Sequence, residues 1–307
     1  IPIVQGPMAW LSEPPLVAAV SNEGGLGVLA AATKSVDEFE SDVARTQTLT
    51  DRPFAANFPI VLGDYAAHIE MVIARRVPIV FMSAGSPELH TARLKSAGIV
   101  CVHVVPNLAL ARTAIRYGVD AIVLESWEAG GHVAPDGITA MTNIRNVAKA
   151  IDRPIIAAGG IADGFGFAAA LCLGAHAVQM GTRFIATRES NSPAIYREKI
   201  VGASEGDVRV FSRGHHPARA LRAAIVDRAI DMEYHGASSR DVLAFIGVGR
   251  ARKAAHDADE NEGIFYAGAS AVLVDDVPTV KALFDRILEE YDRALEGARG
   301  VIVGRRD

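Results

Sequence analysis

Apolar residues in this chain gather into short unbroken runs, separated by longer stretches with helical periodicity or high alanine content. Uninterrupted apolar runs are typical of parallel strands that are buried on both faces, whereas a half-exposed strand would alternate. The pattern predicts eight such strands, at residues 1–5, 27–30, 54–59, 79–81, 100–104, 121–125, 155–158 and 177–180.

The segments between these runs carry helix signals. Pro14 opens one helix, Ser35 and Glu38 form a capping box for another, and residues 164–173 read as an alanine-rich helix. The strand starts lie 21 to 27 residues apart, except for one step of 34. Eight βα units of this kind favour an α/β protein with a closed (β/α)8 TIM barrel, and an open Rossmann sheet is the structural alternative.

The rhythm changes at two places. The long step comes after the sixth strand, where barrel enzymes often keep their chemistry in an extended loop. After residue 192 the βα pattern stops, and residues 193–263 read as a mostly helical cap or substrate domain. We therefore predict a barrel at 1–192, completed by 264–307 with a last helix near 277–295, and a cap at 193–263.

The amino-acid composition argues against some classes of binding partner. The 307 residues are 50% hydrophobic and 22% charged, with a net charge of −5, which argues against nucleic acid or an anionic membrane. Cys101 and Cys172 sit in apolar elements, which predicts two reduced, buried thiols. The chain shows no signal peptide and no membrane span, so we expect a cytoplasmic protein. The acidic run at 257–262 reads as a solvated loop, and no metal site is expected.

Two strands end in glycine turns. Gly159 and Gly160 follow the seventh strand, and Gly181 and Thr182 follow the eighth. Glycine allows a positive φ and lets backbone N–H groups approach an anion closely. Adjacent turns of this kind at the end of a βα series predict a phosphate site.

Other loops and strand ends offer candidate ligand contacts. Met8 and Ala9, after the tight exit Gly6-Pro7, would present N–H groups to a planar ligand, unless this is a plain turn. Asn57 lies in an apolar strand and needs a partner, either a cofactor edge or a backbone group.

The long loop carries the strongest catalytic candidate. Glu125 ends the sixth strand, and Gly130, Gly131 and His132 follow it. The glycines would allow close backbone approach, and the imidazole titrates near neutrality, so His132 could exchange protons with a substrate. The two adjacent histidines at 215–216 are more simply surface residues, although they could touch a substrate.

Motifs of other enzyme classes are missing, including CxxC, HExxH, GxSxG and the Walker sequence. The motifs that are present occur in a recognisable order. In that order, the chain resembles the nitronate monooxygenase family, formerly 2-nitropropane dioxygenases, which also holds flavin enoyl-ACP reductases and some NADH:quinone reductases. The motifs are QGPMAW, Asn57 after DRPFAA, ESWEAGGH, IIAAGGIADG and QMGTRF.

The resemblance implies FMN at the C-terminal mouth of the barrel, with its phosphate on the two glycine turns and His132 as the catalytic residue. It implies contacts to the ring and ribityl chain from Met8, Ala9, Asn57, Glu125, Gly130 and Ala158. Two features depart from the family. Several members of the family carry a lysine on strand five, where this chain has the residues 103–106 without a lysine. Ala269 stands where the family usually has a glutamine.

The leading functional expectation is an FMN-dependent oxidoreductase that oxidises a small alkyl nitronate with O2. The alternative is an NAD(P)H-dependent reductase of an enoyl thioester or quinone, because residues 104–111 and 141–142 resemble the enoyl-reductase branch. A non-catalytic flavin-binding module is the third option. The partner is a small molecule in the first two cases, and a homodimer is one option for the oligomeric state.

Overall fold

The computed structural model describes residues 1–214 and 216–303. Its main feature is an eight-stranded parallel sheet with the order β1-β9-β8-β6-β5-β4-β3-β2. The two outer strands meet through Leu26, which exchanges backbone hydrogen bonds with Ile3 and Gln5, both at 2.9 Å. The sheet therefore closes into a (β/α)8 TIM barrel, as predicted, and the open-sheet alternative is excluded.

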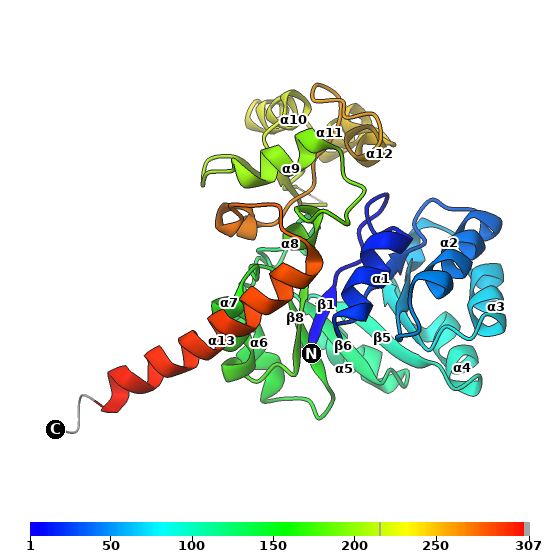
Figure 1. Ribbon diagram of the computed structural model, residues 1–307. Coiled ribbons are helices and arrows are strands. Elements are labelled where there is room, and N and C mark those ends of the chain that lie inside the picture. Colours follow the sequence, from blue (N-terminus) through cyan, green and yellow to red (C-terminus); the bar gives the residue numbers. More distant parts are fainter. Residues whose placement is uncertain (215, 304–307) are drawn as a thin grey trace.

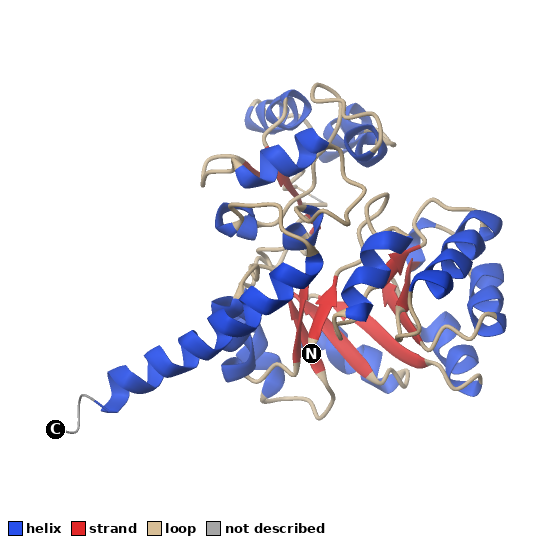
Figure 2. Ribbon diagram, in the orientation of Figure 1, coloured by secondary structure: helices blue, strands red, loops and turns tan. Residues whose placement is uncertain are grey.

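All eight predicted strands are confirmed, to within two residues at each end. They are β1 (Ile3–Gln5), β2 (Val28–Ala30), β3 (Ala55–Pro59), β4 (Ile79–Ser83), β5 (Val100–Val105), β6 (Ala121–Glu125), β8 (Ile155–Ala158) and β9 (Ala177–Met180). The helices that alternate with them cover the outside of the barrel (Figures 1 and 2). They are α1 (Pro14–Asn22), α2 (Val36–Leu49), α3 (Ala66–Ala74), α4 (Glu88–Ser96), α5 (Leu108–Arg116), α6 (Ala140–Ala148), α7 (Gly164–Leu173) and α8 (Thr182–Ile185), with a short 3-10 turn η1 (Ile60–Leu62) after β3.

Local signals in the sequence explain where several helices begin. The Ser35 hydroxyl accepts a hydrogen bond from the Glu38 N–H, and the Glu38 carboxylate accepts one from the Ser35 N–H, which completes the predicted capping box. Asp163 caps α7 in the same way through the N–H of Gly166. These caps fix the loops at the C-terminal end of the barrel, where the site lies.

Each strand contributes side chains to two parts of the hydrophobic core, one inside the barrel and one between the barrel and the helices. Side chains such as Val4, Phe81 and Val123 fill the barrel interior. Their neighbours along the strands point outward and pack against the helices, as Ile3 and Met82 do. Both faces are buried, which is why the strands lack a polar–apolar alternation.

Residues 193–263 add four helices and a hairpin. The helices are α9 (Ala194–Val201), α10 (Ala224–Tyr234), α11 (Ser239–Ile246) and α12 (Arg250–Ala255), and the hairpin strands are β10 (Val208–Phe211) and β11 (Ala218–Leu221). The helical pattern did not predict the hairpin. A separate hydrophobic cluster, which includes Phe211, Val226 and Val242, forms the core of this segment. The proposed domain boundary itself stays a prediction.

The chain then returns to the barrel through η2 (Ala269–Leu273) and ends in the long helix α13 (Val280–Val303). This helix packs along α7 and then projects away from the barrel (Figure 1). Both cysteines are free, as predicted. Cys101 is buried, but the expectation for Cys172 is wrong, because this residue lies on an exposed face of α7. No helix within the described ranges is long and apolar enough to cross a bilayer.

Candidate active site at the mouth of the barrel

The uppermost inward-facing layer of the barrel contains the polar groups of the candidate site. Side chains two residues apart on a strand share a face. Asn57, Ser83, Glu125 and Gln179 each lie two residues beyond an interior residue, so they point into the barrel at its C-terminal mouth. Ala158 occupies the same layer on β8. Of these residues, Asn57, Glu125 and Ala158 are predicted from the sequence, and Ser83 and Gln179 are not.

Two amides in this layer differ in how they are satisfied. The Asn57 side-chain N–H group donates to the Ser83 hydroxyl at 3.2 Å and to the Phe81 carbonyl at 3.4 Å. The Gln179 carbonyl oxygen is buried and has no hydrogen-bond partner. A buried acceptor without a donor is costly, so this oxygen is suited to receive an N–H or O–H from a ligand.

Glu125 is the ionisable member of this layer. Burial raises the pKa of its carboxyl from 4.5 to about 7. No hydrogen bond to this carboxyl is found within the described part of the chain. The group can therefore serve a ligand either as an acceptor or, when protonated, as a donor.

The two glycine turns lie side by side, because β8 and β9 are neighbours and Ala158 pairs with Gln179. Gly159 and Gly160 have φ values of 94° and 78°, which side chains rarely adopt. Across residues 1–214 and 216–303, the backbone N–H groups of Gly160, Gly181 and Thr182 have no protein acceptor. Three unpaired donors at adjacent strand ends can bind an anion.

The first loop approaches the same rim. The Met8 N–H donates to the Ser12 hydroxyl at 2.8 Å, so of the two predicted donors only the Ala9 N–H lacks a protein partner among the described residues. The Met8 side chain lies over Gly181, where a Cβ would be 3.5 Å from its sulfur. Trp10 has a φ of 68° and contacts His256 of the cap edge-on, with ring centroids 5.1 Å apart.

The loop after β6 lies directly on the Gly159–Gly160 turn. A Cβ on Gly159 would come within 2.9 Å of the Ser126 carbonyl oxygen. Gly130 has a different neighbour, because a Cβ there would lie 2.5 Å from the backbone of Ala267 and Gly268. The expected close approach at Gly130 is therefore to the returning chain.

His132 lies on this loop and is held by the cap. Gly131–His132 form the two-residue strand β7, which pairs with β11 in the sheet β10-β11-β7. The buried guanidinium of Arg219 on β11 donates to the carbonyls of Trp127 and Ala129. The sequence analysis missed Arg219, because nothing in the sequence indicates that a cap arginine reaches a barrel loop.

The environment of the imidazole keeps it neutral at pH 7. Burial lowers the pKa of His132, and the nearby charge of His216 lowers it further. Its ring lies 5.7 Å from the ring of Tyr266, a second residue that the sequence analysis missed. His215 lies outside the described residues. A neutral imidazole offers one N–H donor and one acceptor nitrogen, so His132 can both give and take a proton.

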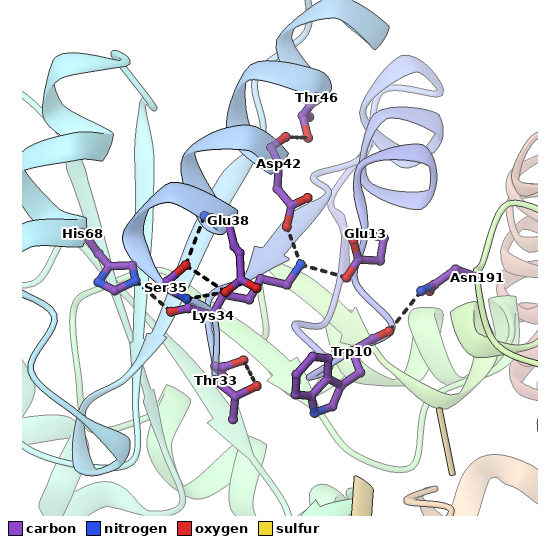
Figure 3. A network of polar contacts seen from close by, with 11 residues as sticks. Trp10, Glu13, Thr33, Lys34, Ser35, Glu38, Asp42, Thr46, His68 and Asn191 are labelled. Carbon is purple, nitrogen blue, oxygen red and sulfur yellow. Dashed lines mark hydrogen bonds and ion pairs between the residues drawn. The ribbon is translucent and has the colours of Figure 1, made fainter. Parts of the chain in front are cut away.

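Cations near the rim are already engaged. In the loop after β2, the Lys34 ammonium contacts both Glu13 and Asp42 (Figure 3). Burial disfavours the charge on Lys34, but the hydrogen bonds to the two carboxylates outweigh it and raise its pKa. On β5, the His103 Nε2–H group donates to the Gly85 carbonyl at 3.1 Å, and the neighbouring Val104 is the residue that packs in the barrel interior. This position supplies no cation to the mouth.

Comparison with known proteins identifies the family. The model of the nitronate monooxygenase family matches residues 1–67 and 59–290. The chain belongs to the nitronate monooxygenase family. The members of this family are flavin-dependent oxidoreductases, and the fold and motifs described above follow its pattern.

Three individual proteins are similar over much of the chain. FabK from Thermotoga maritima is 38% identical, with a TM-score of 0.91 over 98% of this chain and 95% of its own. A (3aS,4S,5R,7aS)-5-hydroxy-7a-methyl-1-oxo-octahydro-1H-indene-4-carboxyl-CoA dehydrogenase of Rhodococcus jostii is 32% identical over 96% of this chain and 94% of its own. A nitronate monooxygenase of Paraburkholderia phytofirmans is 35% identical over 66% of this chain and 68% of its own.

The residues at the mouth suit a flavin. The three unpaired N–H groups match a single phosphate, and the orphaned Gln179 oxygen and the free Glu125 carboxyl match donors on a ring or a hydroxylated chain. Ala269, which stands where the family often has glutamine, donates its N–H to the Glu128 carbonyl at 2.8 Å. The backbone of Ala269 thus helps to hold the His132 loop in position.

Proposed function

We propose that this chain binds FMN and uses it to reduce the double bond of an unsaturated acyl thioester with NAD(P)H. FMN carries a single phosphate, which suits the cluster of unpaired N–H groups on Gly160, Gly181 and Thr182. The Ala9 N–H, Asn57, Glu125, Gln179 and Ala158 would face the ring and the ribityl chain. Met8 would cover the phosphate side, and Gly130 would act only through the position of its loop.

One observation carries the choice of substrate. Two of the relatives that match the chain from end to end, barrel and cap together, are FabK, an enoyl-ACP reductase, and a carboxyl-CoA dehydrogenase, at 38% and 32% identity. Their names point to acyl groups on thioester carriers. The nitronate monooxygenase relative matches 66% of the chain, and a nitroalkane oxidase of Streptomyces ansochromogenes, which covers 97% of it, is less similar, with 29% identity and a TM-score of 0.82. The enoyl-thioester alternative therefore takes precedence over the nitronate expectation.

The neutral imidazole explains the remaining chemistry. When bound, FMN supplies the hydride transfer. A double bond that accepts a hydride at one carbon needs a proton at the other. His132 lies on the loop that rests on the proposed phosphate turn, and its N–H can pass that proton to the substrate while the second ring nitrogen takes a proton from solvent, so that the ring stays neutral. Tyr266 and the pairing of β7 with β11 hold the ring in place.

Nitronate oxidation is the second candidate, because the same neutral imidazole can act as a base toward the carbon of a nitroalkane. An anaerobic stopped-flow experiment separates the two. The purified flavoprotein is mixed with NADH, with NADPH or with ethyl nitronate in three separate experiments. The rate of flavin bleaching is recorded as a function of the concentration of each reagent. We expect rapid bleaching by NADH or NADPH, and reoxidation of the reduced flavin by crotonyl-CoA. Bleaching by the nitronate alone, with O2 uptake in air, would replace the proposal with the second candidate.

A further inference from the structure

A cavity lies in the cap, beside the His132 loop. It has a volume of about 540 Å3 and is bounded by the β10–β11 hairpin, α10 and η2. Three arginines line it, Arg209, Arg213 and Arg219, together with a single carboxylate, Glu205. This volume lies in the range of pockets that hold whole small molecules. The balance of side-chain charge in the cavity is positive.

The protein neutralises this positive charge only in part. Arg209 has one weak ion pair, with Asp227 at 3.9 Å. No ion pair or side-chain hydrogen bond of Arg213 is found in the described part of the chain. Arg213 and Arg219 line the same cavity. Burial lowers the pKa of Arg219, the carboxylate of Glu128 raises it, and the charge of Arg213 lowers it, so the two guanidinium groups repel one another. Like charges held together in this way favour an anion between them.

The remaining walls are apolar. Val208 and Val210 of β10, Ile230 of α10 and Val272 of η2 contribute aliphatic surface. A cavity with aliphatic walls and guanidinium groups matches a molecule with a flat ring system and attached phosphates, since guanidinium binds phosphate with two parallel hydrogen bonds and stacks on aromatic rings.

We infer that this cavity binds a phosphorylated adenosine, the common end of coenzyme A and of NADPH. The inference rests on the proposed function, which needs either a carrier thioester or a pyridine nucleotide. Arg219 connects the two sites, because it lines the cavity and also donates to the carbonyls of Trp127 and Ala129 in the His132 loop. A ligand anchored in the cap would thus have its reactive end near the mouth of the barrel.

Calorimetric titration of the flavin-loaded protein tests the inference without turnover. The ligands are adenosine 3′,5′-bisphosphate and adenosine 2′,5′-bisphosphate, each compared with AMP. The variants are Arg209→Met and Arg213→Met, with the exposed cap residue Arg240→Met as the matched control. We expect at least one bisphosphate to bind about tenfold or more tightly than AMP, and this preference to be lost in R209M and R213M but kept in R240M.

The two bisphosphates distinguish the source. Preference for the 3′,5′ isomer, with a lower KM for crotonyl-CoA than for crotonyl-N-acetylcysteamine, assigns the cavity to coenzyme A. Preference for the 2′,5′ isomer, with a lower KM for NADPH than for NADH, assigns it to the electron donor. Equal binding of AMP and both bisphosphates, or binding that R213M leaves unchanged, overturns the inference. Failure of the proposed function is seen separately, as a protein that binds a bisphosphate but turns over no thioester.

Discussion

The barrel mouth and the cap cavity are built on opposite principles. At the mouth, the inward-facing polar side chains of the strands are two amides, a hydroxyl and one carboxyl whose pKa is raised to about 7, so the layer carries little fixed charge. The residues that line the cap cavity include three arginines and a single carboxylate. A weakly charged mouth suits redox chemistry on a neutral acyl chain, whereas fixed charge suits recognition of a phosphate. Changes at the mouth should therefore alter the rate of chemistry, and changes in the cap should alter affinity.

The largest effect is expected at His132. In the variant His132→Ala we expect kcat to fall by about 10²–10⁴-fold, the usual contribution of a positioned acid or base. The bound flavin should stay, because the phosphate turns are intact. The measurements are the flavin absorbance spectrum and the steady-state rate. His235→Ala, an exposed cap histidine, is the control. A yellow H132A protein with unchanged kcat would remove His132 from the mechanism.

The next effect is expected at Gly130. A Cβ at this position would lie 2.5 Å from the backbone of Ala267 and Gly268, so Gly130→Ala must displace one of two packed segments. We expect a loss of ~1–3 kcal/mol in the free energy of unfolding. Gly206→Ala is the matched control, since a Cβ there meets nothing within 4 Å, and it should change stability by less than about 0.5 kcal/mol. Denaturant titration of both variants is the measurement. Loss of flavin from fully folded G130A would show instead that Gly130 contacts the ligand.

The barrel mouth and the cap also show how much of the structure can be predicted from the sequence. The eight barrel strands follow from their composition, because a strand buried on both faces has little choice of residue. Gln179 was missed although the argument used for Asn57, a polar residue in a buried strand, applies to it equally. This glutamine could have been noticed as the polar residue in the apolar run at 177–180.

The cap residues could not have been found in this way. Arg219 acts on carbonyls 90 and 92 residues away, and such a contact leaves no local pattern in the sequence. The strand β7 has only two residues, Gly131 and His132, and exists because β11 pairs with it. The sequence predicts that Gly130 allows a ligand to approach the backbone. In the structure, the segment that lies closest to Gly130 is the chain that returns from the cap.

Glu125 gives a smaller effect that depends on pH. Its pKa in the folded protein is about 7, above the ordinary 4.5, so the folded state resists ionisation. Below pH 4.5 the carboxyl is protonated in both states and costs nothing. Between pH 4.5 and 7 the unfolded chain ionises first and stability falls, and above pH 7 the full penalty of about 1–3 kcal/mol is present.

The variant Glu125→Gln removes this penalty. In flavin-free protein we expect it to match the wild type in free energy of unfolding at pH 4.5 and to exceed it at pH 8. Urea titrations at the two pH values measure the difference. A gap that is equal at both pH values would mean that the effect comes from packing and that the carboxyl ionises normally at the mouth.

The smallest effect joins the two regions. His216 of the cap, when protonated, lowers the pKa of His132 in addition to the larger effect of burial. His216→Asn should therefore raise the pKa of His132 and move the acid limb of the kcat/KM profile to higher pH. At pH 6 the loss should be less than about tenfold, because a charge near solvent contributes under about 1.4 kcal/mol. At pH 8, where the His132 ring is neutral, variant and wild type should be equally active. A variant that loses activity equally at pH 6 and pH 8 would show that His216 supports the position of the loop and does not act through its charge.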